Sequence, residues 1–212
     1  MSHRILVLDL GGVIVDVDFS RFGRMLAEKC DKTPEAIAAR WSQGPEKDEL
    51  DRGKLTPVAF CDAVVGWCEP GPIRREDVFG AWSDVFAVKP EAAAFLAQLP
   101  PCEGELDYSL WCYSDTDPMH TAALFSRLAP LRRFDERLLS WQNGKLKRDP
   151  GAFEPLVELR NVGSPVLFVD DRQENVDAAH RAGVRAELFT DWPDLTPRLV
   201  DFLHHGHAAS EP

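Results

Sequence analysis

The stretch ILVLDLGGV, residues 5–13, decides the fold of this chain. Four apolar residues, 5–8, end at Asp9, and Gly11 and Gly12 follow at once. An uninterrupted apolar run is typical of a strand that is buried on both faces of a parallel sheet, and paired glycines are typical of a tight loop. The stretch therefore predicts a central strand whose carboxyl end carries Asp9.

Two later segments repeat this pattern. Residues 108–113 lead into Ser114 and Asp115, and residues 165–169 lead into Asp170 and Asp171. Helical patterns occupy residues 89–99, 118–128 and 173–182, the last of them ending at Gly183. Strands that alternate with helices predict a three-layer, Rossmann-like α/β core with a parallel sheet, and ligand sites in such sheets lie at the carboxyl ends of the strands.

Residues 18–88 show no comparable strand, and we call this segment the insert. Its apolar residues recur with helical spacing, as in Phe19, Phe22 and Leu26. Thr33 and Thr56 each precede a proline, which is typical of an N-cap followed by the first residue of a helix. We predict three or four helices here, a core formed by residues 1–17 and 89–203, and a flexible tail at residues 204–212.

Charge and composition favour small-molecule chemistry. The chain has 212 residues and a formal charge of −11, which repels nucleic acid and anionic membranes at long range. Its five cysteines form no CxxC pair, and the N-terminal apolar run is too short for a signal peptide or a membrane span. We expect a cytoplasmic protein without a nucleic-acid or membrane partner. No pattern indicates its oligomeric state.

Four ordered segments together resemble the haloacid-dehalogenase-like hydrolases. They are LDLGGV around Asp9, Ser114 after the second strand, KRDP at residues 147–150, and FVDD ending at Asp171. The resemblance covers residues 5–189 and implies that the insert is a helical cap, as in the subgroup that includes sugar-phosphate phosphatases. It implies that the nucleophile is Asp9, which forms an aspartyl-phosphate, while Ser114 and Lys147 hold the phosphate.

The same resemblance implies a bound Mg²⁺. Its ligands are expected to be Asp9, the Gly11 carbonyl, Asp170 and, through water, Asp171. Hard oxygen ligands suit magnesium, and a cation between a carboxylate and a phosphate relieves their repulsion. Besides Ser114 and Lys147, Asp115 and Arg148 are expected beside the substrate, a small phosphorylated metabolite.

Each of these residues also has a structural role open to it. Asp9 fits a helix-capping residue in a loop, Asp170 and Asp171 fit an N-cap pair for the helix that follows, and Ser114 fits a turn. Lys147 lies in a basic run and fits a solvated surface lysine. Only the order of the four segments favours the functional interpretation.

Three positions depart from the family pattern. Gly11 stands where most family phosphatases carry a second aspartate for proton transfer, a group worth about two to four orders of magnitude in rate. Asp16 or Asp18 is a candidate to replace it. Asp115 brings a negative charge near the phosphate, and Arg148 replaces a proline, which either loosens the loop or adds a phosphate-binding fork.

These departures leave two alternatives to a magnesium-dependent phosphomonoester hydrolase. A catalytically impaired relative that binds a ligand or partner is favoured by Gly11 and Asp115. A haloacid dehalogenase uses an aspartate nucleophile without a metal, and the Asp170-Asp171 pair disfavours it.

Histidines outside these segments have simpler interpretations. His120 lies early in the helix that follows the second strand, and we expect it to be half-exposed. His204, His205 and His207 fall in the predicted tail.

Overall fold

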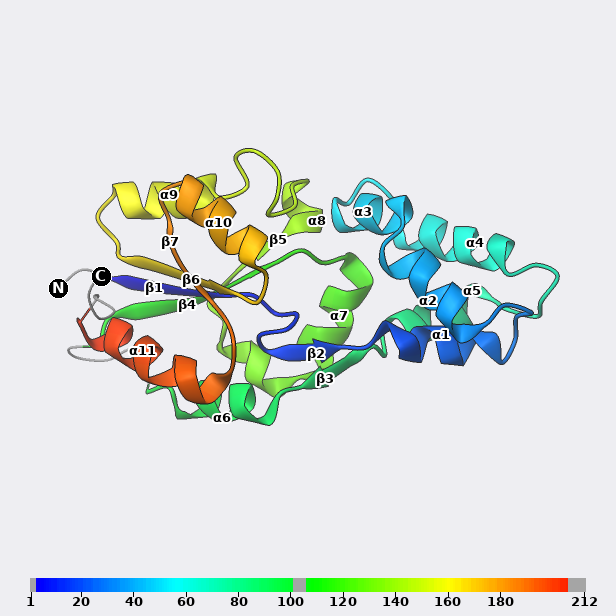
Figure 1. Ribbon diagram of the computed structural model, residues 1–212, viewed down its shortest axis with the longest axis horizontal. Helices are drawn as coiled ribbons and strands as arrows, with labels where there is room; N and C mark the ends of the chain where they lie inside the picture. The colour runs from blue at the N-terminus through cyan, green and yellow to red at the C-terminus, as the bar shows by residue number, and fades with distance from the viewer. Residues whose placement is uncertain (1–2, 101–105, 206–212) are drawn as a thin grey trace.

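The computed structural model describes residues 3–100 and 106–205. Among these residues, five parallel strands form one sheet in the order β5-β4-β1-β6-β7 (Figure 1). The strands are β1 Arg4–Leu8, β4 Tyr108–Ser114, β5 Glu136–Leu139, β6 Val166–Asp170 and β7 Arg185–Leu188. All five residues of β1 are buried, as the apolar run predicts for a strand with a neighbour on each side.

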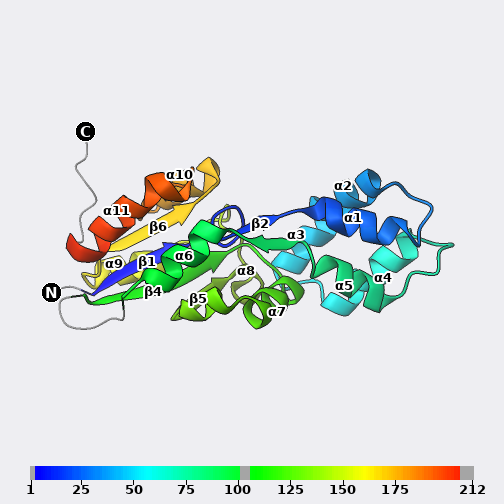
Figure 2. The ribbon, with the colours of Figure 1, turned by 90° about the horizontal axis from the view of Figure 1, so that it is seen from below.

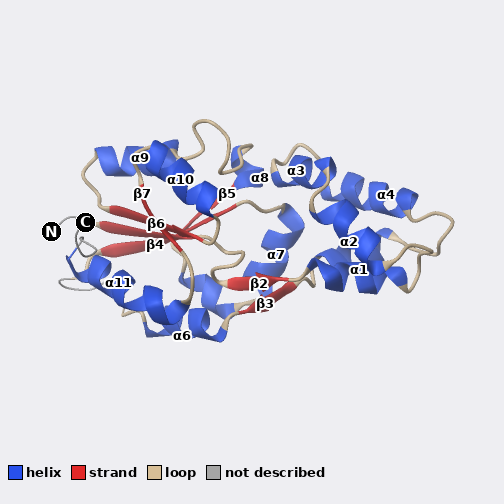
Figure 3. Ribbon diagram, in the orientation of Figure 1, coloured by secondary structure: helices blue, strands red, loops and turns tan. Residues whose placement is uncertain are grey.

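Helices cover both faces of this sheet (Figure 3). Alternate residues of β1 point to opposite faces: Leu6 and Leu8 pack against one group of helices, and Ile5 and Val7 against the other. The first group is α6 Pro90–Gln98, α7 Pro118–Arg127, the 3₁₀ helix Ala129–Arg133 and α11 Trp192–His205. The second is α9 Glu154–Asn161 and α10 Gln173–Arg181, and the short α8 Ser140–Asn143 follows β5. The predicted three-layer α/β core is confirmed.

The insert is mainly helical and has a core of its own. That core contains the fully buried Trp41, Phe60 and Trp82. The helices are α1 Phe19–Ala27, α2 Pro34–Ser42, α3 Pro45–Asp51, α4 Pro57–Trp67 and α5 Arg75–Trp82. Thr33 and Thr56 cap α2 and α4 by accepting backbone N–H bonds, as predicted.

The insert has more helices than expected, five within residues 18–88 instead of three or four. The short helix α3, with the sequence PEKDELD, is mostly charged and has no side-chain hydrogen bond at its N-cap. It therefore lacks both the apolar period and the capping signal on which the prediction depended.

The insert joins the core through a two-stranded antiparallel ribbon of β2 Val15–Val17 and β3 Phe86–Val88. Hydrogen bonds flank the ribbon at both ends, from Asp18 N to Val85 O at 2.8 Å and from Lys89 N to Ile14 O at 3.0 Å. The chain thus enters and leaves the insert at one place, with the sheet on one side and the five helices on the other (Figure 2). The sequence did not indicate β3, because three residues are too few to show a period.

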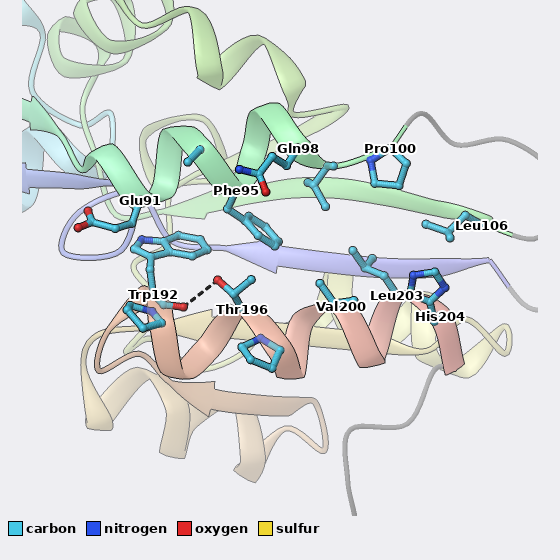
Figure 4. A pocket seen from close by; sticks show the side chains of 14 residues that line it. Glu91, Phe95, Gln98, Pro100, Leu106, Trp192, Thr196, Val200, Leu203 and His204 are labelled. Carbon is cyan, nitrogen blue, oxygen red and sulfur yellow. Dashed lines mark hydrogen bonds between the residues drawn. The ribbon is translucent and has the colours of Figure 1, made fainter.

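The C-terminal helix α11 runs to His205, so the first two residues of the predicted tail are helical. Residues 206–212, including His207, lie outside the described residues. An apolar groove of about 520 Å³ runs between α6 and α11, lined by Phe95, Trp192 and Leu203 among others (Figure 4). None of the described helices is both long and apolar enough to cross a membrane.

Candidate active site

The register of the sheet brings the predicted acidic residues to one edge. Leu8 pairs with Val169 in the neighbouring strand β6, and the Asp9 N–H donates to the Val169 carbonyl at 2.9 Å. Asp9 therefore lies beside Asp170 at the carboxyl ends of the two central strands. Asp9 lines a cavity of about 480 Å³, and Asp170 next to it is fully buried. The cavity lining includes Asp9, Gly11, Gly12, Ser114, Asp115, Lys147, Asp171 and Asn175.

Three carboxylates form a compact cluster here. One oxygen each from Asp9, Asp170 and Asp171 lies within 4.8 Å of the others. Gly12 makes room for this cluster, because a Cβ on its left-handed backbone (φ 73°) would lie 1.9 Å from the Asp171 Oδ2 atom. Three hard oxygen donors at this spacing suit a magnesium ion.

Lys147 lies inside the cluster and is not a surface lysine. Its side chain is 1% exposed, and its Nζ atom lies 2.9 Å from Asp9 Oδ1 and 2.5 Å from Asp170 Oδ2. Burial lowers the pKa of Lys147, but the charges of Asp9 and Asp170 outweigh burial and keep that pKa above its ordinary value. One ammonium among three carboxylates leaves the cluster negative, which favours a further cation.

Asp9 carries the most perturbed carboxyl of the cluster. Burial raises its pKa to about 7, Lys147 opposes the shift, and the charge of Asp170 adds to it. A carboxylate with a raised pKa is a stronger base and, once deprotonated, a stronger nucleophile than an ordinary one.

Asp170 is held in place by helix α10. It accepts hydrogen bonds from the Arg172 backbone N–H at 2.9 Å and from Asn175 Nδ2 at 3.0 and 3.1 Å. Arg172 is the N-cap residue of α10, and neither aspartate supplies a capping bond of the usual kind. Asn175 was not predicted from the sequence. Its position in the first turn of the helix that follows the two aspartates would have indicated that it lies near them.

Ser114 is the last residue of β4, Asp115 follows it, and both line the same cavity. Ser114 is 4% exposed. The carboxylate of Asp115 accepts the backbone N–H of Lys147 at 2.9 Å, so it fastens the loop that carries the lysine. Burial raises the pKa of Asp115, and Lys147 opposes the shift.

Arg148 lines a cavity that adjoins the first one, and it pairs with Asp48 of the insert. Its expected place beside the substrate stays a prediction. Of the two candidates to replace the missing aspartate, Asp16 lines the cavity and pairs with Lys89 at 2.6 Å. Asp18 caps α1 instead.

His120 is buried, and the expectation of a half-exposed side chain was wrong. Its ring is 3% exposed and stacks on Trp82 of the insert, with ring centroids 4.9 Å apart. Its Nδ1 atom lies 2.8 Å from Asp117 Oδ2, and its Nε2 atom lies 2.9 Å from the Trp82 carbonyl. Packing of α5 against α7 buries it, and the sequence of α7 alone carried no sign of that contact.

The insert adds Lys47 to the cavity lining. This lysine lies on α3 and pairs with Asp51 one turn later. A second cavity of about 450 Å³ adjoins the first and shares Lys47 and Asp115 with it. Within the part of the chain that the structure describes, the Oδ1 atom of Asp51 is buried without a hydrogen-bond donor. Sequence reasoning missed both residues, because their position depends on how the insert docks.

Comparison with known proteins identifies relatives over almost the whole chain. No family model matches it. A D-ribitol-5-phosphate phosphatase from Bacteroides thetaiotaomicron is 25% identical over 198 residues, covering 88% of this chain and 93% of the relative. A HAD family enzyme from the same organism superimposes with a TM-score of 0.74 at 18% identity, covering 92% of this chain and 99% of that one. That enzyme has also been crystallised with magnesium and inorganic phosphate.

The fold is shared with an enzyme of different chemistry as well. The L-2-haloacid dehalogenase of Xanthobacter autotrophicus superimposes with a TM-score of 0.60 at 19% identity, covering 98% of this chain and 84% of that one. The fold alone therefore does not separate the two reactions. The chain thus shares its fold with HAD family enzymes and is similar in sequence to a phosphatase.

Proposed function

We propose that the protein is a magnesium-dependent phosphatase that hydrolyses the phosphate monoester of a small metabolite. The observation that carries this proposal is the position of Lys147, buried between Asp9 and Asp170 with Asp171 close by. A nucleophilic carboxylate, an ammonium for the phosphate and a cluster suited to a divalent cation meet in one cavity.

Each residue has a defined part in this reaction. Asp9 attacks phosphorus and the ester oxygen leaves, which gives an aspartyl-phosphate that water then hydrolyses. Ser114 donates a hydrogen bond to a phosphate oxygen, and Lys147 neutralises the charge of Asp9 and of the transferring phosphate. Asp9, Asp170, Asp171 and the Gly11 carbonyl would hold magnesium. Bound there, the ion stabilises the negative charge that develops on the phosphate oxygens.

The substrate we favour is a phosphorylated polyol or sugar. The relative named for D-ribitol 5-phosphate supports this class. So does the second cavity, whose lining contains Ser42, Gln43, Lys47 and Asp51 and is largely polar. Hydroxyl groups would satisfy such a lining, and the unpaired Oδ1 atom of Asp51 is a ready acceptor for one of them.

Gly11 favours a second candidate, a ligand-binding relative that turns over slowly or not at all. A haloacid dehalogenase is disfavoured because it has no use for a three-carboxylate cluster. The experiment that separates all three is a panel of phosphorylated sugars and alditols, assayed for release of inorganic phosphate with magnesium and with a chelator, beside a 2-haloacid assayed for halide.

The Asp9→Asn variant, measured in the same assay, tests the role of Asp9 as the nucleophile. We expect it to abolish phosphate release while circular dichroism and thermal unfolding show an intact fold. Asp31→Asn, at an exposed aspartate of the insert that pairs with Lys32, is the matched control for removal of a carboxylate. Phosphate release by Asp9→Asn at the rate of the unmodified protein would exclude the mechanism.

A further inference from the structure

Helix α3 of the insert touches the core at the loop that carries Lys147. Figure 1 and Figure 3 show α3 next to α8, and the two are in contact. Three separate contacts join α3 and its C-terminal turn to this part of the core. They involve Arg52 with Asp149, Asp48 with Arg148, and Gly53 with Trp141.

The Arg52–Asp149 contact is the strongest of the three. Both arms of the guanidinium bind the carboxylate, one of them from Nη2 to Oδ1 at 2.9 Å, and the two side chains are only 19% and 23% exposed. Asp149 also accepts the backbone N–H of Leu146 at 2.9 Å. The bond with Arg52 keeps the pKa of Asp149 below its ordinary value, so the carboxylate stays charged. A two-armed bond of this kind fixes orientation as well as distance.

The second contact joins Arg148 to Asp48 across the same boundary. Both side chains are about half-exposed, at 47% and 48%, so solvent weakens this pair. Arg148 directly follows Lys147 in the chain. The loop is therefore tied to the insert on the carboxyl side of the lysine at two successive positions, 148 and 149.

The third contact is steric and independent of charge. Gly53 has a left-handed backbone (φ 65°), and a Cβ there would lie 2.2 Å from the carbonyl oxygen of Trp141 in α8. Only glycine lets the end of α3 approach the core this closely. Helix α8 begins at Ser140, whose hydroxyl accepts the Thr116 N–H and donates to the Thr116 carbonyl. The contact at Gly53 is therefore linked to the loop after β4.

We propose that α3 is a latch that positions the active-site lysine, with Arg52 and Arg148 as its positioning residues. Docking of the insert holds residues 146–149 in the conformation that places the Lys147 ammonium between Asp9 and Asp170. Closure over a substrate is thereby coupled to assembly of the phosphate-binding site. The kinetic part of this inference rests on the proposed function, whereas its structural part does not.

Arg52→Met is the first test, because methionine keeps much of the side-chain bulk and removes the charge. We expect kcat to fall about 100-fold, since misplacement of a catalytic group by about 1 Å has effects of this size. We expect KM to change far less, because the cavity lining is preserved. The control is Arg75→Met, which breaks a comparable pair with Asp62 inside the insert and should leave kcat unchanged.

Amide hydrogen exchange gives a measurement that needs no activity. The N–H groups of Leu146 and Lys147 donate to Asp149 and Asp115, so they report on the loop directly. In Arg52→Met and in Gly53→Ala they should exchange at least about tenfold faster, while the β1 amides stay protected. Faster exchange in a protein without phosphatase activity would uphold the latch and reject the proposed function.

Charge reversal tests the weaker pair. Asp48→Arg and Arg148→Asp should each accelerate exchange of the Lys147 amide, and the double variant Asp48→Arg/Arg148→Asp should restore it. Arg52→Met with unchanged kcat and unchanged exchange would overturn the latch. If the Lys147 amide still exchanges fast in the double variant, Arg148 is not part of the latch.

Discussion

Gly11 is the residue on which turnover depends most. It lies two positions after Asp9 on the wall of the cavity. The space at this position is open, because a Cβ would touch only the Val17 side chain, at an ordinary 3.5 Å. Its backbone is also outside the left-handed region, so a larger residue fits without strain.

Gly11→Asp should therefore raise kcat. A general acid and base placed beside the nucleophile contributes about 100-fold or more. Steady-state phosphate release measures the effect, and Gly11→Asn is the control, since it adds the same bulk without an ionisable group. An unchanged rate in Gly11→Asp would mean that another group already transfers the proton.

Asn175 orients the carboxylate of Asp170, for which we propose a role in metal binding. Asn175→Ala removes two hydrogen bonds from that carboxylate, and loss of such a supporting group weakens metal binding by about 10- to 100-fold. Titration calorimetry with Mg²⁺ measures the change. Gln173→Ala, an exposed residue on the same helix, should bind Mg²⁺ like the unmodified protein; equal affinity in both variants would contradict the role of Asn175.

Among single residues, those at strand ends were predictable from the sequence. Those that reach the cavity from the insert were not. Asp9, Ser114 and Asp170 were predictable because an apolar run stops immediately before each of them or at it. Lys47 was not, because its place at the cavity depends on the docking of α3 and no local pattern encodes docking.

Between elements, Asp117 joins α7 of the core to α5 of the insert. It caps α7 through the N–H groups of Met119 and His120, and it accepts the indole N–H of Trp82 at 3.0 Å. Burial raises the pKa of Asp117, but the charge and hydrogen bonds of His120, together with Lys47, outweigh burial and hold that pKa well below its ordinary value. The carboxylate thus stabilises the folded protein.

Asp117→Asn should lower the free energy of unfolding by about 2 kcal/mol near neutral pH, the scale of a hydrogen bond to a charged group. A carboxylate with a lowered pKa stabilises the fold above its unfolded value of about 3.9 and loses that contribution as the pH falls below it. The difference between the two proteins should therefore be constant from about pH 7 to about pH 5 and shrink steadily from about pH 5 to about pH 2. Urea unfolding across this range measures it; a difference that does not shrink would mean that Asp117 carries no stabilising charge.

The elements that the sequence predicted well are the long or fully buried ones. β1, β4 and β6, and the helices α6, α7 and α10, begin and end within two residues of their predicted bounds. The edge strands β5 and β7, with sequences ERLL and RAEL, were not predicted. Each has only four residues, two of them charged, so neither an apolar run nor an alternation had room to develop.

The described residues form a sheet domain and an insert, which are linked by a ribbon and by the contacts of α3 and α5. The insert core holds Trp41, Phe60 and Trp82, and the sheet has separate cores on its two faces. We propose that residues 18–88 unfold as a unit of their own.

The Phe60→Ala variant tests whether the insert unfolds separately from the sheet. Removal of a fully buried phenylalanine costs about 3–5 kcal/mol, which falls on the insert alone if its core is independent. We expect urea unfolding followed by tryptophan fluorescence to split into two transitions, with the amides of β1 still protected after the first. A single transition by both measurements would show that the insert and the sheet unfold together.

The β2–β3 ribbon has a consequence for how such a protein diversifies. Because both crossings lie side by side, the two ends of the insert are separated by the width of one strand pair. A gene segment of almost any length can be exchanged between these points without altering the order of the sheet or the catalytic edge. Related proteins can thus acquire new substrates by replacement of the insert. The replacement must again contact the loop at residues 146–149.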